Sequence, residues 1–182
     1  ELLELCLTRG AKNDPHPHFG QTALQIAVST GHYRCAKAIL ETAAASNAVE
    51  HIINLEGPNK EAPLHEASKL GDENCVELLM KFNADFSVVD SKGRTPLHSA
   101  CAFGKTRCAA VLLDLGADDM LEFGDHAGDT PLHAAADGGF VECVQLLLHT
   151  AANPRVVNTL GLTPYQLASQ NNSTDHIRCQ EL

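Results

Sequence analysis

Four cysteines recur at one position of the sequence, and residues of this type could hold a metal ion or form redox pairs. Cys35, Cys75, Cys108 and Cys143 each stand thirteen residues after the start of a recurring tetrapeptide. Packed helices of neighbouring units lie about 8 to 10 Å apart, whereas a disulfide needs Cα atoms within roughly 7 Å and zinc needs sulfurs at about 2.3 Å. The column also falls on an apolar helix face, so we expect these thiols to pack in the core as small hydrophobes.

Histidines form a second column, and imidazoles could act as metal ligands or as general bases. His65, His98 and His133 occupy the fourth position of three tetrapeptides. They are spread one per unit and would have to converge to build a site. His16 and His18 form a looser pair without further ligands, which is more typical of a solvated loop than of a metal site.

Sequence motifs of known catalytic sites are missing from the chain. It contains no Gly-rich phosphate loop, no Gly-x-Ser-x-Gly, no His-Glu-x-x-His and no Cys-x-x-Cys. These motifs place nucleophiles, phosphates or metals at fixed spacings. We therefore expect no catalytic residue, no metal site and no cofactor.

The tetrapeptide that organises both columns occurs five times. The copies begin at Thr22, Ala62, Thr95, Thr130 and Thr163, and they read Thr-Ala-Leu-Gln, Ala-Pro-Leu-His, Thr-Pro-Leu-His twice and Thr-Pro-Tyr-Gln. The intervals between them are 40, 33, 35 and 33 residues. The basic period is therefore 33, with extra residues after the first and third copies, and such a period indicates stacked supersecondary units.

Each copy predicts two helices and a loop. Thr is a favourable N-cap and Pro is tolerated at the first helical position. A Gly that permits the left-handed conformation ends the helix nine residues after the first four copies begin, at Gly31, Gly71, Gly104 and Gly139. A second helix with apolar residues at helical spacing follows, and polar stretches such as 90–93 and 125–128 then form exposed loops. One such hairpin buries its apolar face only by stacking on its neighbours.

The period, the Thr-Pro-Leu-His start, the Gly between helices and the Leu-Leu-x-x-Gly-Ala ending at 112–117 resemble the ankyrin repeat family over nearly the whole chain. The resemblance implies an all-α solenoid of stacked helix-turn-helix units with protruding loop or β-hairpin fingers. It also implies that the histidine column makes structural hydrogen bonds around the turn and to neighbouring backbone. Gln25 and Gln166, which replace His in two copies, keep a hydrogen-bonding side chain.

We expect a single array over 1–182. It divides into a partial repeat at 1–15, a repeat at 16–53 with an insertion near 43–52, repeats at 54–86, 87–121 and 122–154, and a terminal capping or truncated repeat at 155–182. Residues 2–11 resemble the second half of a repeat, so the chain is expected to start within a repeat. The insertion predicts a lengthened second helix or an added turn.

The charge, hydropathy and cysteine content of the chain indicate which classes of partner and which compartment to expect. A formal net charge of -10 argues against nucleic acid, because affinity for phosphates comes mostly from Lys and Arg. No apolar run approaches the roughly 20 residues that a membrane span needs. The seven cysteines are odd in number and dispersed, which predicts reduced thiols in a cytoplasmic or nuclear compartment. We expect a monomeric module without direct membrane insertion.

Charge is unevenly distributed along the chain. From Cys108 to Pro154 there is no Lys or Arg, and the eight acids there are Asp114, Asp118, Asp119, Glu122, Asp125, Asp129, Asp137 and Glu142. This stretch is either an ordinary solvated surface or a surface that attracts a basic segment of a partner. Asp125, Asp129 and Asp137 are the better candidates for the second role, because two fall in a loop finger and one ends a first helix.

By resemblance, a partner binds the concave side through the fingers and the exposed face of each first helix. The family's contact positions flank the finger Gly and precede the Gly between the helices. The candidates are Phe19, Lys69, Leu70, Ser91, Lys92, Arg94, Phe103, His126, Asp129 and Asp137. Phe103 beside Lys92 and Arg94 is typical of a binding hot spot, or it folds down between repeats as packing.

Two functions from different classes remain open. The first is a non-catalytic scaffold or adaptor that presents a rigid concave face to a protein or peptide, with an acidic C-terminal half that favours basic segments. The second is a regulatory or targeting portion of a larger enzyme or channel whose active domain lies outside the 182 residues. A start within a repeat and the lack of an initiating Met favour a longer parent protein.

Overall fold

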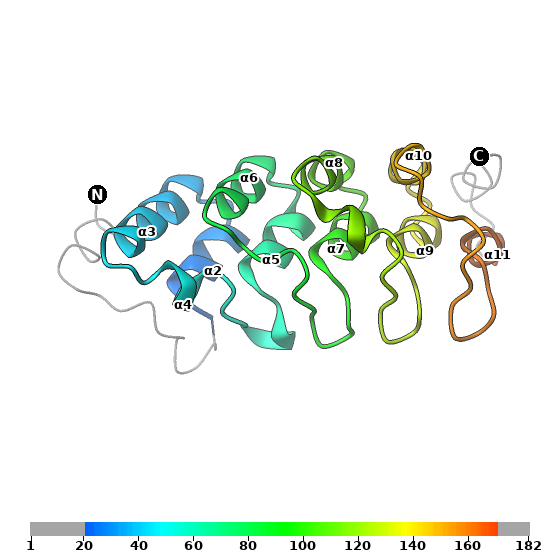
Figure 1. The fold of residues 1–182 in the computed structure, drawn as a ribbon, viewed down its shortest axis with the longest axis horizontal. Helices are drawn as coiled ribbons and strands as arrows, with labels where there is room; N and C mark the ends of the chain where they lie inside the picture. The colour runs from blue at the N-terminus through cyan, green and yellow to red at the C-terminus, as the bar shows by residue number, and fades with distance from the viewer. Residues whose placement is uncertain (1–20, 171–182) are drawn as a thin grey trace.

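The computed structural model describes residues 21–170, and within this range it contains α-helices and short 3-10 helices but no β-strand. The first helices of successive units are α2 (Ala23–Ser29), α5 (Pro63–Leu70), α7 (Pro96–Ala102), α9 (Pro131–Asp137) and α11 (Pro164–Ser169). The second helices are α3 (Tyr33–Ala45), α6 (Glu73–Lys81), α8 (Thr106–Asp114) and α10 (Val141–His149). The first helices form one row and the second helices another (Figure 1). The predicted all-α solenoid of stacked helix pairs is confirmed.

The loops that precede the first helices project from the array, below the row of first helices in Figure 1. We call them the fingers, and they comprise residues 57–61, 90–94, 125–129 and 158–162. Each is closed by a hydrogen bond from the amide of its first residue to the carbonyl of its last, with N···O distances of 2.9 to 3.0 Å. A short 3-10 helix, η1 (Pro58–Lys60), lies in the first of them. Of the two forms expected for the fingers, loop or β-hairpin, the structure has the loop within residues 21–170.

The tetrapeptides start the first helices as expected. The hydroxyl oxygens of Thr22, Thr95, Thr130 and Thr163 accept hydrogen bonds from the amides of residues 25, 98, 133 and 166, at 3.1 to 3.5 Å. These bonds satisfy amides that have no partner inside the helix. Ala62, which starts the second tetrapeptide, has no side-chain acceptor for this bond.

Left-handed residues end both helices in the first four described units. The four glycines after the first helices have φ between 64° and 85°, which confirms the predicted stop. The second helices are followed by Asn47, Asn83, Gly116 and Ala151, whose φ values are also positive. The left-handed conformation costs conformational free energy for an L-residue with a Cβ, and this cost is smaller for Asn than for Ala.

The insertion near 43–52 takes both of its expected forms. Helix α3 has 13 residues where α6, α8 and α10 have 9 each. A further short helix, α4 (Val49–Ile52), follows it before the chain reaches the first described finger. After α8 the chain forms η2 (Ala117–Met120), in the loop that carries the two residues added to the third unit.

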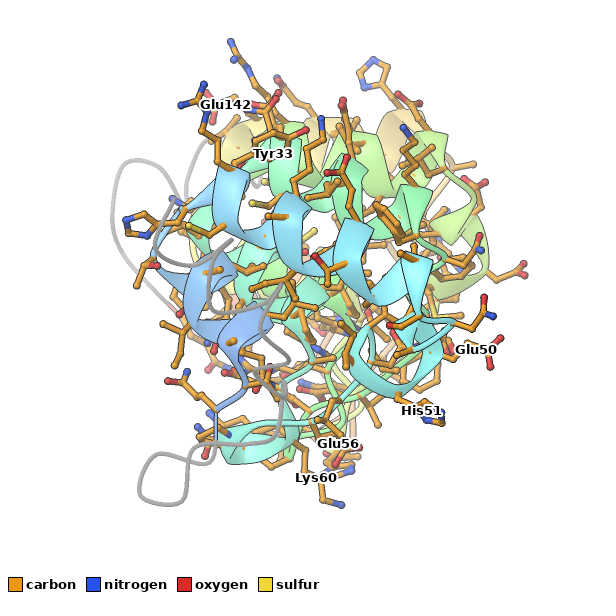
Figure 2. All side chains as sticks on the ribbon, turned by 90° about the vertical axis from the view of Figure 1, so that its left-hand side faces the viewer. Tyr33, Glu50, His51, Glu56, Lys60 and Glu142 are labelled. Atoms are coloured by element: carbon orange, nitrogen blue, oxygen red, sulfur yellow. The ribbon has the colours of Figure 1, made fainter. Side chains whose placement is uncertain are left out.

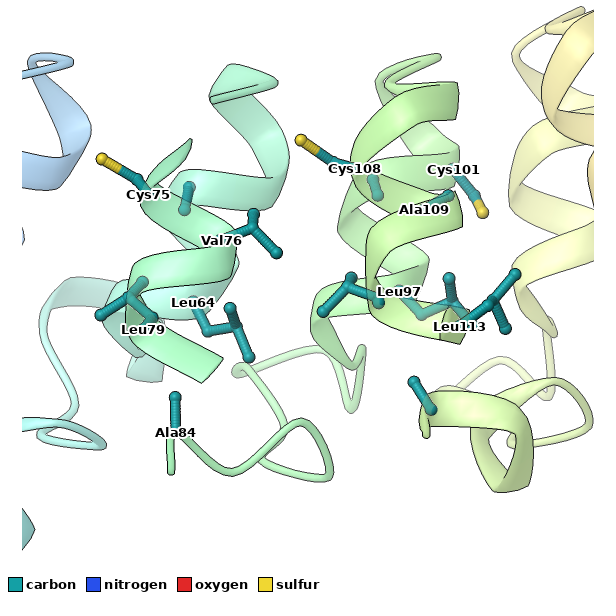
Figure 3. Close-up of a cluster of buried hydrophobic side chains, with 14 of the residues drawn as sticks. Leu64, Cys75, Val76, Leu79, Ala84, Leu97, Cys101, Cys108, Ala109 and Leu113 are labelled. Atoms are coloured by element: carbon teal, nitrogen blue, oxygen red, sulfur yellow. The ribbon is translucent and has the colours of Figure 1, made fainter. Parts of the chain in front are cut away.

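The buried apolar residues form one core cluster that extends from Leu24 to Ala168, and Figure 3 shows its side chains in two neighbouring units. The first four tetrapeptides each contribute one buried leucine to it, at Leu24, Leu64, Leu97 and Leu132. Burying one such side chain stabilises the fold by roughly 1.5 to 3 kcal/mol. Viewed along the array, Glu56 and Lys60 lie at the finger end and Tyr33 and Glu142 at the end with the second helices (Figure 2).

Candidate binding face

The histidine column joins each unit to the next. Nε2 of His65 lies 2.8 Å from the carbonyl oxygen of Arg94, and Nε2 of His98 lies 2.9 Å from that of Asp129. His133 makes the same contact with the Leu162 carbonyl at 3.0 Å. Each acceptor is the last residue of the next finger. The predicted structural role of these histidines is confirmed.

Gln25 replaces His in the first described unit and makes an equivalent link. Its side-chain amide donates to the carbonyl oxygens of Glu61 and Leu55, both at 3.0 Å. Its Oε1 accepts from the amide of Thr22 at 2.8 Å, as histidine Nδ1 does in the other units. The fourth position of the tetrapeptide therefore supplies a side chain that forms a hydrogen bond with the next finger.

Burial favours the neutral form of the His65 and His98 imidazoles. Nδ1 of His98 accepts from the Thr95 amide, so Nε2 carries the hydrogen that is donated to the Asp129 carbonyl. Burial lowers the pKa of His98 and of His65, and the carbonyl bonds oppose this only in part. Both rings are therefore neutral donors rather than bases open to a substrate.

The cysteine column lies in the core. Cys75, Cys108 and Cys143 are fully buried, and Cys35 is partly buried. The Cys75 and Cys108 side chains point the same way along the array (Figure 3). Burial raises the pKa of Cys75 to about 12 and that of Cys108 to about 11. These thiols remain protonated, and residues 21–170 contain no group of three or more His, Cys, Asp or Glu side chains placed to hold a metal ion.

A carboxylate or amide at the start of each of the last three fingers folds back on its own loop. Oδ1 of Asp90 accepts from the amides of Lys92 and Arg94 at 2.8 and 2.9 Å. Asp125 accepts in the same way from residues 127 and 129, and Asn158 from residues 160 and 162. Asp125, expected as a candidate for binding a basic segment, therefore uses its carboxylate to shape its finger.

Hydrogen bonds between backbones also link neighbouring fingers. The amide of Ser91 donates to the Asn59 carbonyl at 2.7 Å, and the amide of His126 donates to the Lys92 carbonyl at 2.9 Å. Thr159 continues the series through the carbonyl of Ala127 at 2.9 Å. The fingers thus form one connected row, and Ser91, Lys92 and His126 are exposed on it.

The first helices expose one face beside the fingers. With the first residue of the tetrapeptide counted as one, the fifth, eighth and ninth residues of each unit share this face because they are spaced by three and four residues. Their exposure varies: Ile26, Leu70, Phe103 and Asp137 are exposed, Glu66 is partly buried and Ser99 is fully buried. We call this surface the inner face. Its large apolar members are Ile26, Leu70 and Phe103, which are 41%, 45% and 48% exposed. Phe103 therefore does not fold down between repeats.

Arg94, Asp129 and Lys69, which were predicted to bind a partner, use their side chains in contacts within the chain. The guanidinium of Arg94 binds Oδ2 of Asp90 through Nε and Nη2 at 2.9 and 2.7 Å. Asp129 accepts at 2.8 Å from the side-chain amide of Asn158 in the next finger. Nζ of Lys69 lies 2.7 Å from Oε2 of Glu61. Replacing Arg94 or Asp129 would disturb the fingers as well as any binding.

The remaining predicted residues divide into three groups. Leu70, Phe103 and Asp137 lie exposed at the ends of first helices, and Ser91, Lys92 and His126 lie at finger tips. Phe19 falls outside the described residues. The structure thus places several candidates along one surface, while their part in binding stays a prediction.

The acidic stretch does not form one surface. Asp114 ends α8, Asp118 and Asp119 lie in η2, and Glu142 lies in the first turn of α10. Because the helices of a pair are antiparallel, the end of a second helix is remote from the loop that joins the pair. Within the stretch, Asp137 is the acid that lies exposed on the inner face.

One cluster of charged side chains on this face was not predicted from the sequence. Oε2 of Glu66 lies 3.6 Å from Nζ of Lys69, which also binds Glu61. Glu66 and Lys69 are three residues apart on α5, a spacing that predicts contact. Glu61 comes from the end of the preceding finger, and no local pattern would have placed it beside them.

Comparisons with known proteins agree with this architecture. A family model described as ankyrin repeats in three copies matches residues 40–122 and 119–179, and a model of a single ankyrin repeat matches residues 19–51. No curated protein matches the chain. No helix within residues 21–170 is long and apolar enough to cross a bilayer. From the matched residues and the stacked helix pairs, we conclude that the chain belongs to the ankyrin repeat family.

Proposed function

We propose that this array is a non-catalytic module that binds another protein on its inner face, as a scaffold or an adaptor. Ankyrin repeats generally mediate contacts between proteins. The proposal assigns the contact to the first helices and the finger tips, with Leu70 and Phe103 at its centre. The fold class alone does not identify a site, so the proposal depends on the side chains of that face.

The exposure of Leu70 and Phe103 is the observation that carries the proposal. They occupy the same position in neighbouring units and are 45% and 48% exposed. The same position is Thr30 in the preceding unit and Gly138 in the following one, so the repeat does not require an apolar residue there. Adjacent exposed apolar side chains on helices that pack together are typical of an interaction site.

The links between units favour binding by keeping this face rigid. The side chains of Gln25, His65, His98 and His133 each reach the next finger, and backbone bonds join the finger tips. A surface that is ordered before binding loses less conformational entropy when the partner arrives. The partner therefore meets a preformed face.

The charge distribution favours a partner with a basic segment towards the C-terminal half. Asp137 supplies exposed negative charge on the inner face there. The acids on other faces of the same half add a long-range potential, which accelerates encounter with a basic partner and is screened by salt. The proposed location is the cytoplasm or the nucleus, where the thiols stay reduced.

Alanine substitutions at Leu70 and Phe103 test the proposal. Partner proteins are captured on the immobilised full chain from a cell extract, and each captured protein is then purified and titrated against the variants. Leu115→Ala is the matched control, because Leu115 is 47% exposed but follows the second helix α8. We expect Leu70→Ala and Phe103→Ala to weaken binding at least tenfold, as hot-spot truncations of about 1.4 kcal/mol or more do.

Thermal unfolding of each variant provides the folding control. Both inner-face side chains are about half exposed, so their truncation should leave the unfolding midpoint nearly unchanged. Equal loss of binding in Leu115→Ala and in the inner-face variants would contradict the proposal. So would a partner whose affinity is insensitive to both inner-face substitutions.

A further inference from the structure

Two carboxylates share one ammonium group on the inner face of the second described unit. Nζ of Lys69 lies 2.7 Å from Oε2 of Glu61 and 3.6 Å from Oε2 of Glu66. Both carboxylates are thus within ion-pair distance of the same ammonium nitrogen. With all three groups ionised, the cluster carries one excess negative charge.

This excess charge is poorly solvated. The Glu61, Glu66 and Lys69 side chains are only 9%, 19% and 25% exposed. Burial raises the pKa of Glu66; Lys69 opposes the shift, and the neighbouring Glu61 adds to it. Confining a second carboxylate here costs folding free energy, because two like charges lose water and repel each other.

The repeat itself does not require the Glu66 carboxylate. The equivalent first-helix position is Ile26 in the preceding unit, Ser99 and Ala134 in the next two, and Leu167 in the last. The fold is thus built equally well with apolar or small residues at this position. A costly charge that the fold does not need is better explained by binding.

Glu61 is held firmly in place. Its backbone carbonyl accepts from the side-chain amide of Gln25 at 3.0 Å and from the amide of Gly57 at 2.9 Å. Glu66 is fixed by the helix α5, one turn from its start. The backbone at both residues is therefore fixed, and a cation that binds the two carboxylates need not order the finger or the helix first.

Exposed apolar side chains flank the pair. Leu70 follows Glu66 by four residues and so lies on the same face of α5. Ile26 occupies the equivalent of the Glu66 position on the neighbouring helix α2. A ligand at the carboxylate pair would therefore contact apolar surface on two sides.

We infer that Glu61 and Glu66 form the anchor site for a Lys or Arg side chain of a partner protein segment whose adjacent bulky apolar residues cover Leu70 and Ile26. The inference rests on the proposed function and names the chemistry of the partner at one place on the inner face. A cation between the two carboxylates neutralises the excess charge and separates it from water. Arginine suits the site best, because its planar guanidinium donates to two oxygens at once.

Selection from random peptides displayed on phage tests this inference. The immobilised full chain is the bait, and enriched sequences are synthesised for titration. We expect enrichment of Arg or Lys next to bulky apolar residues. Glu66→Gln should weaken binding of the selected peptides about tenfold, because an amide cannot neutralise the partner's charge.

Glu77→Gln is the matched control. It removes the same unit of charge from an exposed position on the second helix of the same unit. Its effect on the affinity should be small and should vanish at high salt. Replacing the basic residue of the peptide by Gln should cost the same tenfold with the unsubstituted chain, and much less with Glu66→Gln.

The outcomes separate this inference from the proposed function. Peptides that bind with no basic preference, or that lose equal affinity with Glu66→Gln and Glu77→Gln, would overturn the anchor site. The proposed function would survive that result if Leu70→Ala and Phe103→Ala still weakened binding. Enriched peptides that are insensitive to all inner-face substitutions, or no enriched peptide at all, would overturn both.

Folding of Glu66→Gln is checked by thermal unfolding. We expect its midpoint to equal or exceed that of the unsubstituted chain, because the substitution removes the repulsion with Glu61 and leaves the Lys69 contact at 2.7 Å. A variant that binds less tightly but is as stable shows that the carboxylate serves binding. A large loss of stability would instead assign Glu66 to the fold and overturn the inference.

Discussion

The imidazole of His98 in one unit donates its Nε2 hydrogen to the backbone carbonyl of Asp129 in the next, across 2.9 Å. His98 is fully buried, so no water replaces this bond if the side chain is removed. We expect His98→Ala to lower the free energy of unfolding by about 2 to 4 kcal/mol, through a buried carbonyl without a donor and a cavity. Urea titration followed by circular dichroism measures the change.

His98→Gln is the control for that substitution. Gln25 makes the same kind of bond to the next finger in the first described unit. The glutamine variant should therefore recover most of the lost stability, to within about 1 kcal/mol of the unsubstituted chain. If both variants were equally unstable, the ring rather than its hydrogen bond would be the stabilising element.

Stability should also fall in mild acid. Burial lowers the pKa of His65 and His98 in the folded chain, whereas in the unfolded chain both return to about 6.5. Below that value the unfolded chain binds more protons, so stability is fully present above about pH 6.5 and is lost as the pH falls. Between about pH 7.5 and about pH 5.5, each histidine should lower the free energy of unfolding by at most about 1.4 kcal/mol.

Urea titrations at these two pH values measure the effect. His98→Gln should remove the share that belongs to one histidine and leave that of His65. Asp90 acts at lower pH: burial opposes ionisation, but bonds from Arg94 and from finger amides prevail and lower its pKa. Its contribution is present above the unfolded pKa and is lost only in stronger acid. Stability that did not change between about pH 7.5 and about pH 5.5 would contradict the assignment.

The repeat, its helices and the roles of the histidine and cysteine columns follow from local signals. A cap at Thr95, a stop at Gly104 and a buried residue at Cys108 each depend on their own unit, and recurrence in other units repeats the signal. The insertion was located for the same reason, since it interrupts the period. The structure can be predicted from local sequence wherever the contacts that determine it lie within one unit or recur in every unit.

The binding face was harder to predict, because contacts within the chain decide which charges remain for a partner. Asp125 appears in the sequence as one acid among eight, yet its carboxylate accepts two amides of its own finger. Recurrence contained the missing signal: Asp90, Asp125 and Asn158 each precede a finger Gly by three residues. Recurrence at one position predicted a structural role for the histidines, and it predicts the same role for Asp90, Asp125 and Asn158.

The missing cap at Ala62 offers a way to stabilise the array. The equivalent threonines accept from the amide three residues on, and in two units their hydroxyl also contacts histidine Nδ1 at 2.8 to 2.9 Å. Ala62 is fully buried, but so are Thr22 and Thr95 at the same position, so the unit accommodates a threonine. Ala62→Thr should raise the free energy of unfolding by about 1 kcal/mol.

Thr95→Ala is the reciprocal change and should lower the free energy of unfolding by about the same amount. Both variants are compared by urea titration at neutral pH. A lower stability of Ala62→Thr would show that the added methyl and hydroxyl groups are overpacked at this unit and that its backbone differs from the others.

Ala151 is held in a conformation that suits glycine. Its φ is 69°, and the equivalent residue after the preceding second helix is Gly116, with φ 104°. A left-handed L-residue other than Asn or Asp costs roughly 1 to 2 kcal/mol, of which the greater flexibility of unfolded glycine returns a part. Ala151→Gly should therefore raise the free energy of unfolding by about 0.5 to 1 kcal/mol, as measured by urea titration.

Gly116→Ala is the reciprocal change and should lower the free energy of unfolding by a similar amount. Because a Cβ at Gly116 would meet no atom within 4 Å, that loss would come from the backbone alone. A stabilising Gly116→Ala would show that the end of α8 does not need the left-handed residue, and the argument for Ala151 would fail with it.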